Sequence, residues 1–217
     1  MAWSCGSTSN TKGVDVSADQ GSQIGTQSYW KSLRTNDNVT LAFIKATEGT
    51  SYADPYLSGA WSACNAVNGL DWTYLYHFLD WQYSGTTQAN HFWSVISALT
   101  NPTFQGTKTV LAVDVEEPNG TSSTGTPSIT VVNDFINRLL VLGANEENLV
   151  IYTNQDTWVN ELGNPSTWKL LALWLAAPNG ISWCPGYTFG GWANWSFMQY
   201  GEATLEGYAT DLDEANV

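Results

Sequence analysis

The feature that most constrains the fold is a series of short apolar segments, rich in β-branched and aromatic residues, each ending in polar residues or glycine. This length and composition are typical of buried strands in a parallel sheet. We therefore expect strands at residues 13–17, 39–49, 72–79, 109–117, 148–154, 170–177 and 195–201.

Helical patterns lie between these strands. In the clearest, Thr126 is expected to cap the helix, Pro127 to take its first position and Gly143 to end it. Further helices are expected at residues 27–34, 55–67 and 86–100.

Strands that alternate with helices predict βαβ units and a mainly parallel sheet. The helical segments shorten in the last third of the chain. We therefore expect an α/β fold, a single-domain irregular (β/α) TIM-like barrel with reduced helices in its second half, over residues 13–217 after an N-terminal extension of residues 1–12.

The charge balance limits the partners. The chain has 7 Lys and Arg against 20 Asp and Glu, a formal net charge of −13. A nucleic-acid binder needs a basic surface, so we expect no nucleic-acid partner. No apolar run approaches the roughly 18–20 residues that cross a membrane, so no membrane partner is expected either. The 12 Trp outnumber the Lys and Arg together. Aromatic faces, amides, hydroxyls and a few carboxylates suit sugar ligands.

The cysteines and histidines indicate no cofactor. Cys5, Cys64 and Cys184 lack metal-like spacing, and the two histidines are not paired, so no metal is expected. The cysteines are either buried or free thiols, or one disulfide with one free thiol. The first residues lack the basic and apolar regions of a signal peptide. We therefore expect a mature secreted protein or one released by another route.

A pair of carboxylates closes one expected strand. Residues two apart in a strand share a face at about 6.5–7 Å, so Asp114 and Glu116 are expected to point together, with Glu117 on the opposite face. Their oxygens could then approach to around 5–6 Å, near the roughly 5–5.5 Å of retaining glycosidases. By itself the pair is also compatible with a solvated acidic strand end or a calcium site.

Other strands end in the same way. Asp15 ends the first strand, Glu48 the second, and Asp211 and Asp213 follow the last apolar run. In a parallel barrel the C-terminal strand ends carry the chemistry. Converging carboxylates repel one another and raise each other's pKa, which suits a general acid better than a structural role. His77 alternates with Tyr76 and is expected to be a hydrogen-bonded structural residue.

Motifs along nearly the whole chain resemble glycoside hydrolase family 25, the Chalaropsis-type lysozymes. They are Gly-Val-Asp-Val-Ser at 13–17, Phe-Ile-Lys-Ala-Thr-Glu-Gly at 43–49, Tyr-His-Phe at 76–78, Asp-Val-Glu at 114–116, Leu-Trp-Leu-Ala at 173–176, Gln-Tyr at 199–200 and Thr-Asp-Leu-Asp at 210–213. Two positions depart from the family pattern. Met198 stands where the family usually has tryptophan, and Asp213 where it usually has asparagine, which leaves the sugar contacts at that end of the cleft open.

The resemblance implies an irregular barrel that cleaves the β-1,4 bond between N-acetylmuramic acid and N-acetylglucosamine in bacterial peptidoglycan, with retention of configuration and without a cofactor. It gives Glu116 the role of general acid and base. Asp114 is then the nucleophile or the group that orients the substrate's own acetamido group. It further implies supporting carboxylates at Asp15 and Asp211, and substrate-binding residues at Glu48, Tyr76, Tyr152, Trp174 and Gln199.

Two other functions stay open at this point. One is a chitinase-like hydrolase, and the other a non-catalytic glycan-binding barrel, against which the intact Asp114 and Glu116 argue. In each case we expect a secreted protein that acts as a monomer.

The excess of acidic residues predicts how salt affects lysis. Bacterial walls are anionic, so a chain with net charge −13 is repelled by them at low ionic strength. We expect clearing of whole cells to accelerate when salt is added from near zero, as followed by turbidity. A rate that falls steadily with added salt would show that the acidic surface does not limit approach to the wall.

Overall fold

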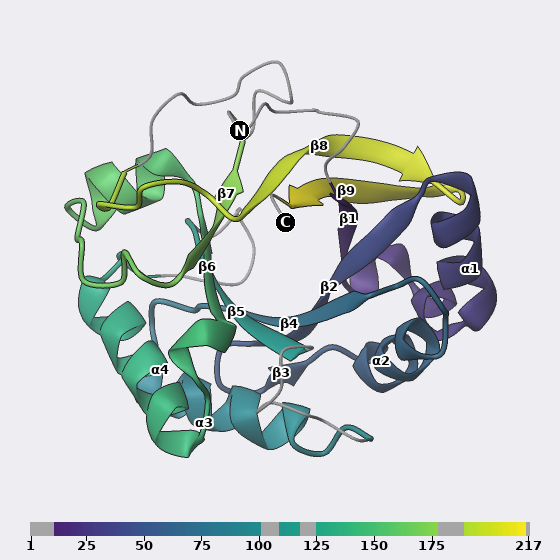
Figure 1. Cartoon of the computed structure of the whole chain (residues 1–217). Coiled ribbons are helices and arrows are strands. Elements are labelled where there is room, and N and C mark those ends of the chain that lie inside the picture. The colour runs from purple at the N-terminus through teal and green to yellow at the C-terminus, as the bar shows by residue number, and fades with distance from the viewer. Residues whose placement is uncertain (1–10, 101–108, 118–124, 178–188, 216–217) are drawn as a thin grey trace.

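The computed structural model describes residues 11–100, 109–117, 125–177 and 189–215, and its centre is a barrel (Figure 1). The strands are β1 (Thr11–Val16), β2 (Val39–Glu48), β3 (Tyr52–Ala53), β4 (Trp72–Phe78), β5 (Thr109–Val115), β6 (Leu149–Thr153), β7 (Ala172–Ala176), β8 (Phe197–Leu205) and β9 (Tyr208–Ala215). The α-helices are α1 (Gln27–Asn36), α2 (Leu57–Asn65), α3 (Gly85–Ile96) and α4 (Ile129–Leu142). Short helical turns are η1 (Ala18–Gln20), η2 (Ser22–Gly25), η3 (Glu146–Asn148) and the π-helical η4 (Thr157–Glu161).

Strand pairing closes the barrel. The order is β1-β9-β8-β7-β6-β5-β4-β2-β3, and β1 also pairs with β2, so that only the short β3 lies outside the closed ring. Strands β1, β2, β4, β5, β6, β7 and β8 pair in parallel around the ring, whereas β9 runs antiparallel to both β8 and β1, and β3 runs antiparallel to β2. The expected irregular α/β barrel is therefore confirmed.

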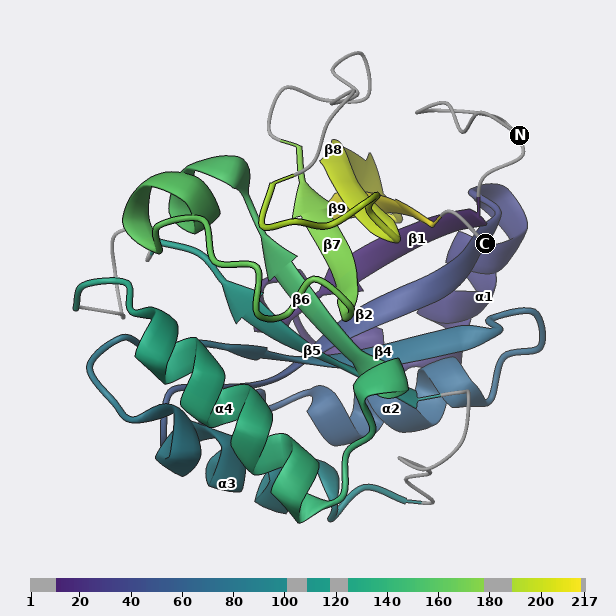
Figure 2. The ribbon, with the colours of Figure 1, turned by 60° about the vertical axis from the view of Figure 1, so that its left-hand side comes forward.

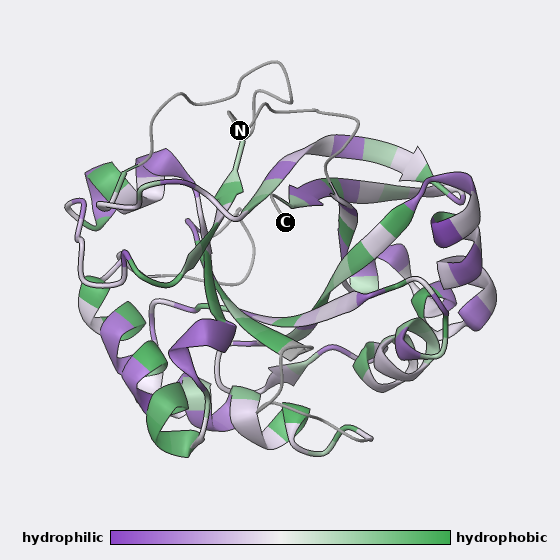
Figure 3. Ribbon diagram, viewed as in Figure 1, coloured by the Kyte–Doolittle hydropathy of each residue, from purple (hydrophilic) through white to green (hydrophobic). Residues whose placement is uncertain are grey.

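Helices cover the first half of the barrel (Figures 1 and 2). Helices α3 and α4 pack side by side, and α1 and α2 lie against β2. Only the π-helical η4 separates β6 from β7, and the described residues between β7 and β9 form no helix. Hydrophilic and hydrophobic stretches follow one another along α4 (Figure 3). Within the described ranges, no helix is long and apolar enough to cross a membrane.

Strand alternation builds two hydrophobic cores. Outward residues such as Ile44, Leu75 and Val113 pack under the helices in the larger core. Inward residues form the smaller one inside the barrel, with Phe43 stacked on Trp174 at 3.7 Å between ring centroids and on Tyr74 at 4.5 Å. Bulky aromatic residues fill the barrel, so its interior is a packed floor rather than a pore.

The structure corrects three sequence expectations. The helix expected to begin at Pro127 begins at Ile129, with extended Ser128 as its N-cap, because Val132 and Phe135 set the buried face. Strand β9 was not predicted, since its alternating acidic residues resemble a solvated tail; pairing with strands on both sides stabilises it. Strand β1 begins at Thr11, just before the expected barrel boundary at residue 13.

We expect Gly85→Ala to destabilise the barrel by its effect on helix packing. A Cβ at Gly85 would lie 2.0 Å from the carbonyl oxygen of Val131 and 2.5 Å from the backbone nitrogen of Phe135, where α3 crosses α4. Overpacking of this kind costs about 1–3 kcal/mol, measurable by urea unfolding. The matched control is Gly201→Ala, whose Cβ would meet nothing within 4 Å. Equal stability of the two variants would contradict the prediction.

Candidate active site

The C-terminal strand ends surround a cavity of about 360 Å³. The expected site residues that line it are Asp15, Tyr76, Asp114, Glu116, Tyr152, Trp174, Gln199 and Asp211. They come from β1, β4, the end of β5, β6, β7, β8 and β9, so barrel closure brings together residues far apart in the sequence. Of the residues expected in the site, only Glu48 is absent from the lining.

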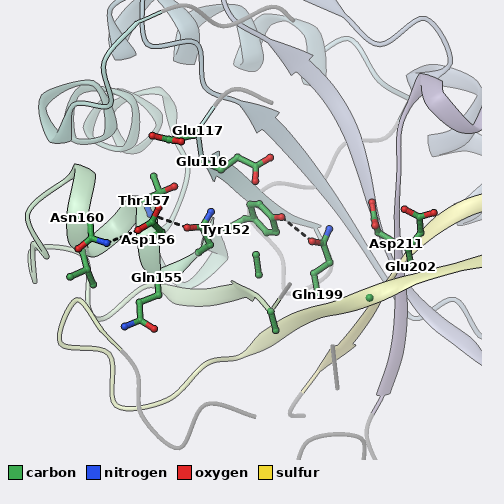
Figure 4. A pocket seen from close by; sticks show the side chains of 15 residues that line it. Glu116, Glu117, Tyr152, Gln155, Asp156, Thr157, Asn160, Gln199, Glu202 and Asp211 are labelled. Carbon is green, nitrogen blue, oxygen red and sulfur yellow. Dashed lines mark hydrogen bonds between the residues drawn. The ribbon is translucent and has the colours of Figure 1, made fainter. Parts of the chain in front are cut away.

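A second hollow of about 800 Å³ continues from the first (Figure 4). Glu116, Tyr152, Gln199 and Asp211 line both. Gln155, Asp156 and Asn160 border the larger hollow on one side, and Glu202 lies beside Asp211 on the other. Together the two hollows form a cleft whose walls carry amides, hydroxyls and carboxylates.

Alternation along β5 places the expected carboxylate pair. Asp114 follows inward Ala112, whereas Val113 and Val115 enter the outer core. Asp114 is 7% exposed, and its Oδ1 is buried with no hydrogen-bond partner among the described residues. Glu116 is half-buried just beyond the strand, and the indole of Trp81 donates a 3.1 Å hydrogen bond to its backbone oxygen. Glu117 is exposed and lines only the larger hollow.

Burial and mutual repulsion raise the pKa of four cavity carboxyls, those of Asp15, Asp114, Glu116 and Asp211. Burial raises the pKa of Glu116 to about 7, with a contribution from Asp211 and an opposing one from the Lys45 ammonium. The pKa of Asp211 rises to about 6 through burial and the nearby Glu202. Burial, and then the charge of Glu116, raises the pKa of Asp114 well above its usual range. A half-buried carboxyl that titrates near neutrality is suited to proton transfer.

A line of hydrogen bonds organises one wall of the cavity. The hydroxyl of Tyr152 donates to Gln199 Oε1 at 2.9 Å, and Gln199 Nε2 donates to Asp15 Oδ2 at 2.8 Å. Burial, followed by repulsion from Asp211, raises the pKa of Asp15 to about 8. These bonds fix the side chains that face the cleft.

Lys45 is a cavity residue that the sequence analysis did not single out. Its Nζ forms a 2.8 Å ion pair with Glu48 Oε2 and lies 5.0 Å from the ring centroid of Phe78. Glu48 therefore lies beside the cavity, paired with Lys45, without lining it. Alternation on β2, where Leu41 and Phe43 face inward, is the signal that could have identified Lys45 as an inward residue.

His77 is structural, as expected from its alternation with Tyr76. It is fully buried, its Nδ1 lies 2.7 Å from Thr47 Oγ1, and its Nε2 lies 3.2 Å from Gln88 Oε1. Since Gln88 Oε1 also accepts from the Asp80 backbone, Nε2 carries the ring proton and Nδ1 accepts from Thr47. Burial lowers the pKa of His77 to about 3, so the ring is neutral.

The two departures from the family pattern differ in kind. Met198 is fully buried in the outer core and lines neither hollow, so it leaves the cleft wall unchanged. Asp213 is also fully buried, but its Oδ1 accepts a 2.8 Å hydrogen bond from the indole of Trp174, a cavity residue.

The remaining sequence expectations concern thiols and metals. Cys64 is a buried free thiol beside Thr73, and burial raises its pKa to about 12. Cys5 and Cys184 lie outside the described residues. In the part of the chain that the structure describes, no group of three or more His, Cys, Asp or Glu side chains is placed to hold a metal ion.

Comparisons with known proteins agree with the motifs. The chain matches Glycosyl hydrolases family 25 over residues 14–207. It is 31% identical over 214 residues to lysozyme M1 of Streptomyces globisporus, covering 95% of this chain and 67% of that protein.

Solved structures show the same barrel. The bacterial lysozyme from Streptomyces coelicolor has a TM-score of 0.74 and 27% identity, covering 97% of this chain and 94% of that chain. A family GH25 lysozyme from Aspergillus fumigatus, at 24% identity, has the same fold with a TM-score of 0.76, covering 96% of this chain and 95% of that chain. The family expected from the motifs is therefore confirmed: the chain belongs to glycosyl hydrolase family 25 and is a glycoside hydrolase of the lysozyme (muramidase) type.

Proposed function

We propose that the chain cleaves the β-1,4 bond between N-acetylmuramic acid and N-acetylglucosamine in bacterial peptidoglycan, with Glu116 as general acid and base. The observation that carries the proposal is the position of Glu116, which lines both hollows and whose pKa burial raises to about 7. A glycan strand that crosses from one hollow to the other passes this carboxyl.

Glu116 is suited to both halves of a retaining reaction. Its pKa of about 7 leaves a large protonated fraction at and below neutral pH, so it can donate a proton to the leaving glycosidic oxygen. The resulting carboxylate then takes a proton from the attacking water. The acid form is thus restored for the next cycle.

Asp114 is proposed to stabilise the positive charge that develops at the sugar. Its carboxyl group lines the cavity and can receive the N–H of the substrate's acetamido group, which would orient the acetamido oxygen toward the anomeric carbon. In the alternative route, a carboxylate oxygen of Asp114 attacks that carbon directly as the nucleophile. Both routes retain the configuration.

We also propose an oligomeric state, a location and a set of sugar-binding residues for the enzyme. The enzyme is proposed to act as a monomer. Peptidoglycan lies outside the cell membrane, so we propose a secreted or released enzyme. Asp15, Asp211, Tyr76, Tyr152, Trp174 and Gln199 are proposed to hold the sugars, and Glu48 to act through its ion pair with Lys45.

Glu116→Gln should abolish lysis while leaving the fold intact. The amide matches the carboxyl in shape but cannot donate a proton to the leaving oxygen, and loss of general acid catalysis costs about 10²–10⁴ in rate. Turbidity of bacterial walls measures lysis, and circular dichroism checks folding. The control is Glu147→Gln, at an exposed acid in η3, which should lyse normally. Full clearing by the Glu116 variant would refute its assignment.

Mass spectrometry of the products tests the bond that is cut. Purified peptidoglycan should yield fragments whose new reducing end is N-acetylmuramic acid. Chitin oligomers serve as the comparison substrate. A reducing end of N-acetylglucosamine, or faster cleavage of chitin than of peptidoglycan, would favour the chitinase-like alternative.

The pH dependence of activity tests how the charge of Lys45 affects the pKa of Glu116. Activity is expected to fall as pH rises through about 7, where Glu116 loses its proton. Because the ammonium of Lys45 lowers the pKa of Glu116, Lys45→Met should raise that pKa and move the alkaline limb of kcat/KM to higher pH. Lys31→Met, on the exposed face of α1, is the control and should not move the limb. A shift to lower pH in the Lys45 variant would contradict the prediction.

A further inference from the structure

The carboxyl group of Asp213 lies beneath the cavity, with one of its oxygens unpaired. Asp213 is fully buried, and its Oδ1 accepts the hydrogen bond from Trp174. Its Oδ2 is also buried, and in the described part of the chain no N–H or hydroxyl group donates to it. A buried ionised oxygen without a donor is costly, whereas a protonated one can itself donate.

Strand pairing brings Asp213 close to a second carboxyl group. On the antiparallel pair of β1 and β9, Asp213 lies opposite Gly13, and Asp211 lies opposite Asp15. A Cβ at Gly13 would lie 3.2 Å from Cβ of Asp213, so the glycine leaves room for the buried side chain. The carboxyl groups of Asp213 and Asp15 are within hydrogen-bonding reach. Two carboxyl groups form a hydrogen bond only when one of them holds a proton.

The surrounding donors indicate which group is ionised. Asp15 Oδ2 already accepts from Gln199, whose amide is oriented by the hydroxyl of Tyr152. This hydrogen bond opposes the rise in the pKa of Asp15, whereas the buried Oδ2 of Asp213 has no such donor within the residues that the structure describes. The proton that the two carboxyl groups share therefore resides on Asp213, and Asp15 is the ionised partner. The charged groups that face Asp213 are Asp15 on β1 and Asp211 on β9, both negative when ionised; Tyr152 on β6 and Tyr200 on β8 are the nearby titratable hydroxyls.

We propose that Asp213 is a neutral carboxylic acid in the working enzyme and donates its proton in a hydrogen bond to Asp15. It is a positioning residue, because it reaches the cavity only through Asp15 and Trp174, which line it. A neutral carboxyl offers one donor and one acceptor, as an asparagine amide does, which accounts for an aspartate at this position. Burial and the neighbouring Asp15 raise the pKa of Asp213 well above its usual range. The catalytic consequence rests on the proposed function, whereas the protonation state does not.

Carbon NMR of the aspartate carboxyl groups tests the proton without any activity measurement. In protein labelled at aspartate Cγ, wild type should show a signal of a protonated carboxyl at pH 7 that Asp213→Asn lacks. The Asp71→Asn variant, at an exposed aspartate, is the assignment control and should retain the signal. If every aspartate assigned to this pair gives the signal of an ionised carboxylate at pH 7, the proposal is wrong.

The pH profile of peptidoglycan cleavage separates a neutral Asp213 from a charged one. Asp213→Asn should retain activity and leave the alkaline limb in place, because it exchanges one neutral group for another. Asp211→Asn is the matched control on the same strand. The Asp211→Asn variant lacks a negative charge that raises the pKa of Glu116, so the alkaline limb of its pH profile should move to lower pH. A comparable shift in the Asp213→Asn variant would overturn the proposal.

Asp213→Leu tests whether the hydrogen bonds matter. It should lose at least about tenfold in kcat, since the buried indole of Trp174 and the carboxyl of Asp15 would both lose their partner. If the asparagine variant keeps its kcat and the leucine variant does not, the result supports a neutral hydrogen-bond donor at residue 213 that positions Asp15. Equal activity of the leucine and asparagine variants would contradict it, and should the leucine variant fail to fold, the NMR signal and the asparagine profile still decide.

Discussion

The antiparallel pairing of β9 with both β8 and β1 is the constraint on which the rest of the structure depends. It closes the sheet, so that neither β1 nor β8 is left as an open edge. It also places Asp211 and Asp213, near the end of the chain, against Asp15 near its beginning. Without this pairing the cavity would lack one wall, and Glu116 would lose the neighbour that helps to raise its pKa.

The barrel below the cavity is filled by aromatic side chains. Phe43 contacts Tyr74, Trp174 and Phe197, and Tyr152 contacts Trp174 edge to face at 4.6 Å. This apolar floor keeps water from the inner ends of the carboxyl groups, which is why burial is the largest cause of each raised pKa. The same packing that stabilises the fold therefore also raises the pKa values of the carboxyl groups in the site.

Few positive charges are available to offset these carboxylates. In the described part of the chain, Lys45 is the cation that lines the smaller cavity, and it is itself paired with Glu48. Its ammonium opposes the raised pKa of both Asp114 and Glu116. The chain as a whole has few Lys and Arg residues, and the same holds in the site. There, repulsion between the carboxyl groups is reduced mainly by bound protons and less by cationic side chains.

The sequence by itself determined seven strands, β1, β2 and β4 to β8, and the inward positions of Asp114 and Tyr76, because a strand places alternate residues on opposite faces. It also determined the family, because the motifs lie in order along the chain. Tertiary structure decided the rest. It made a strand of the acidic segment that forms β9, and it buried Asp213 against Asp15. These outcomes depend on contacts between segments distant in sequence, and local pattern carries no information about which distant segments will meet when the barrel closes.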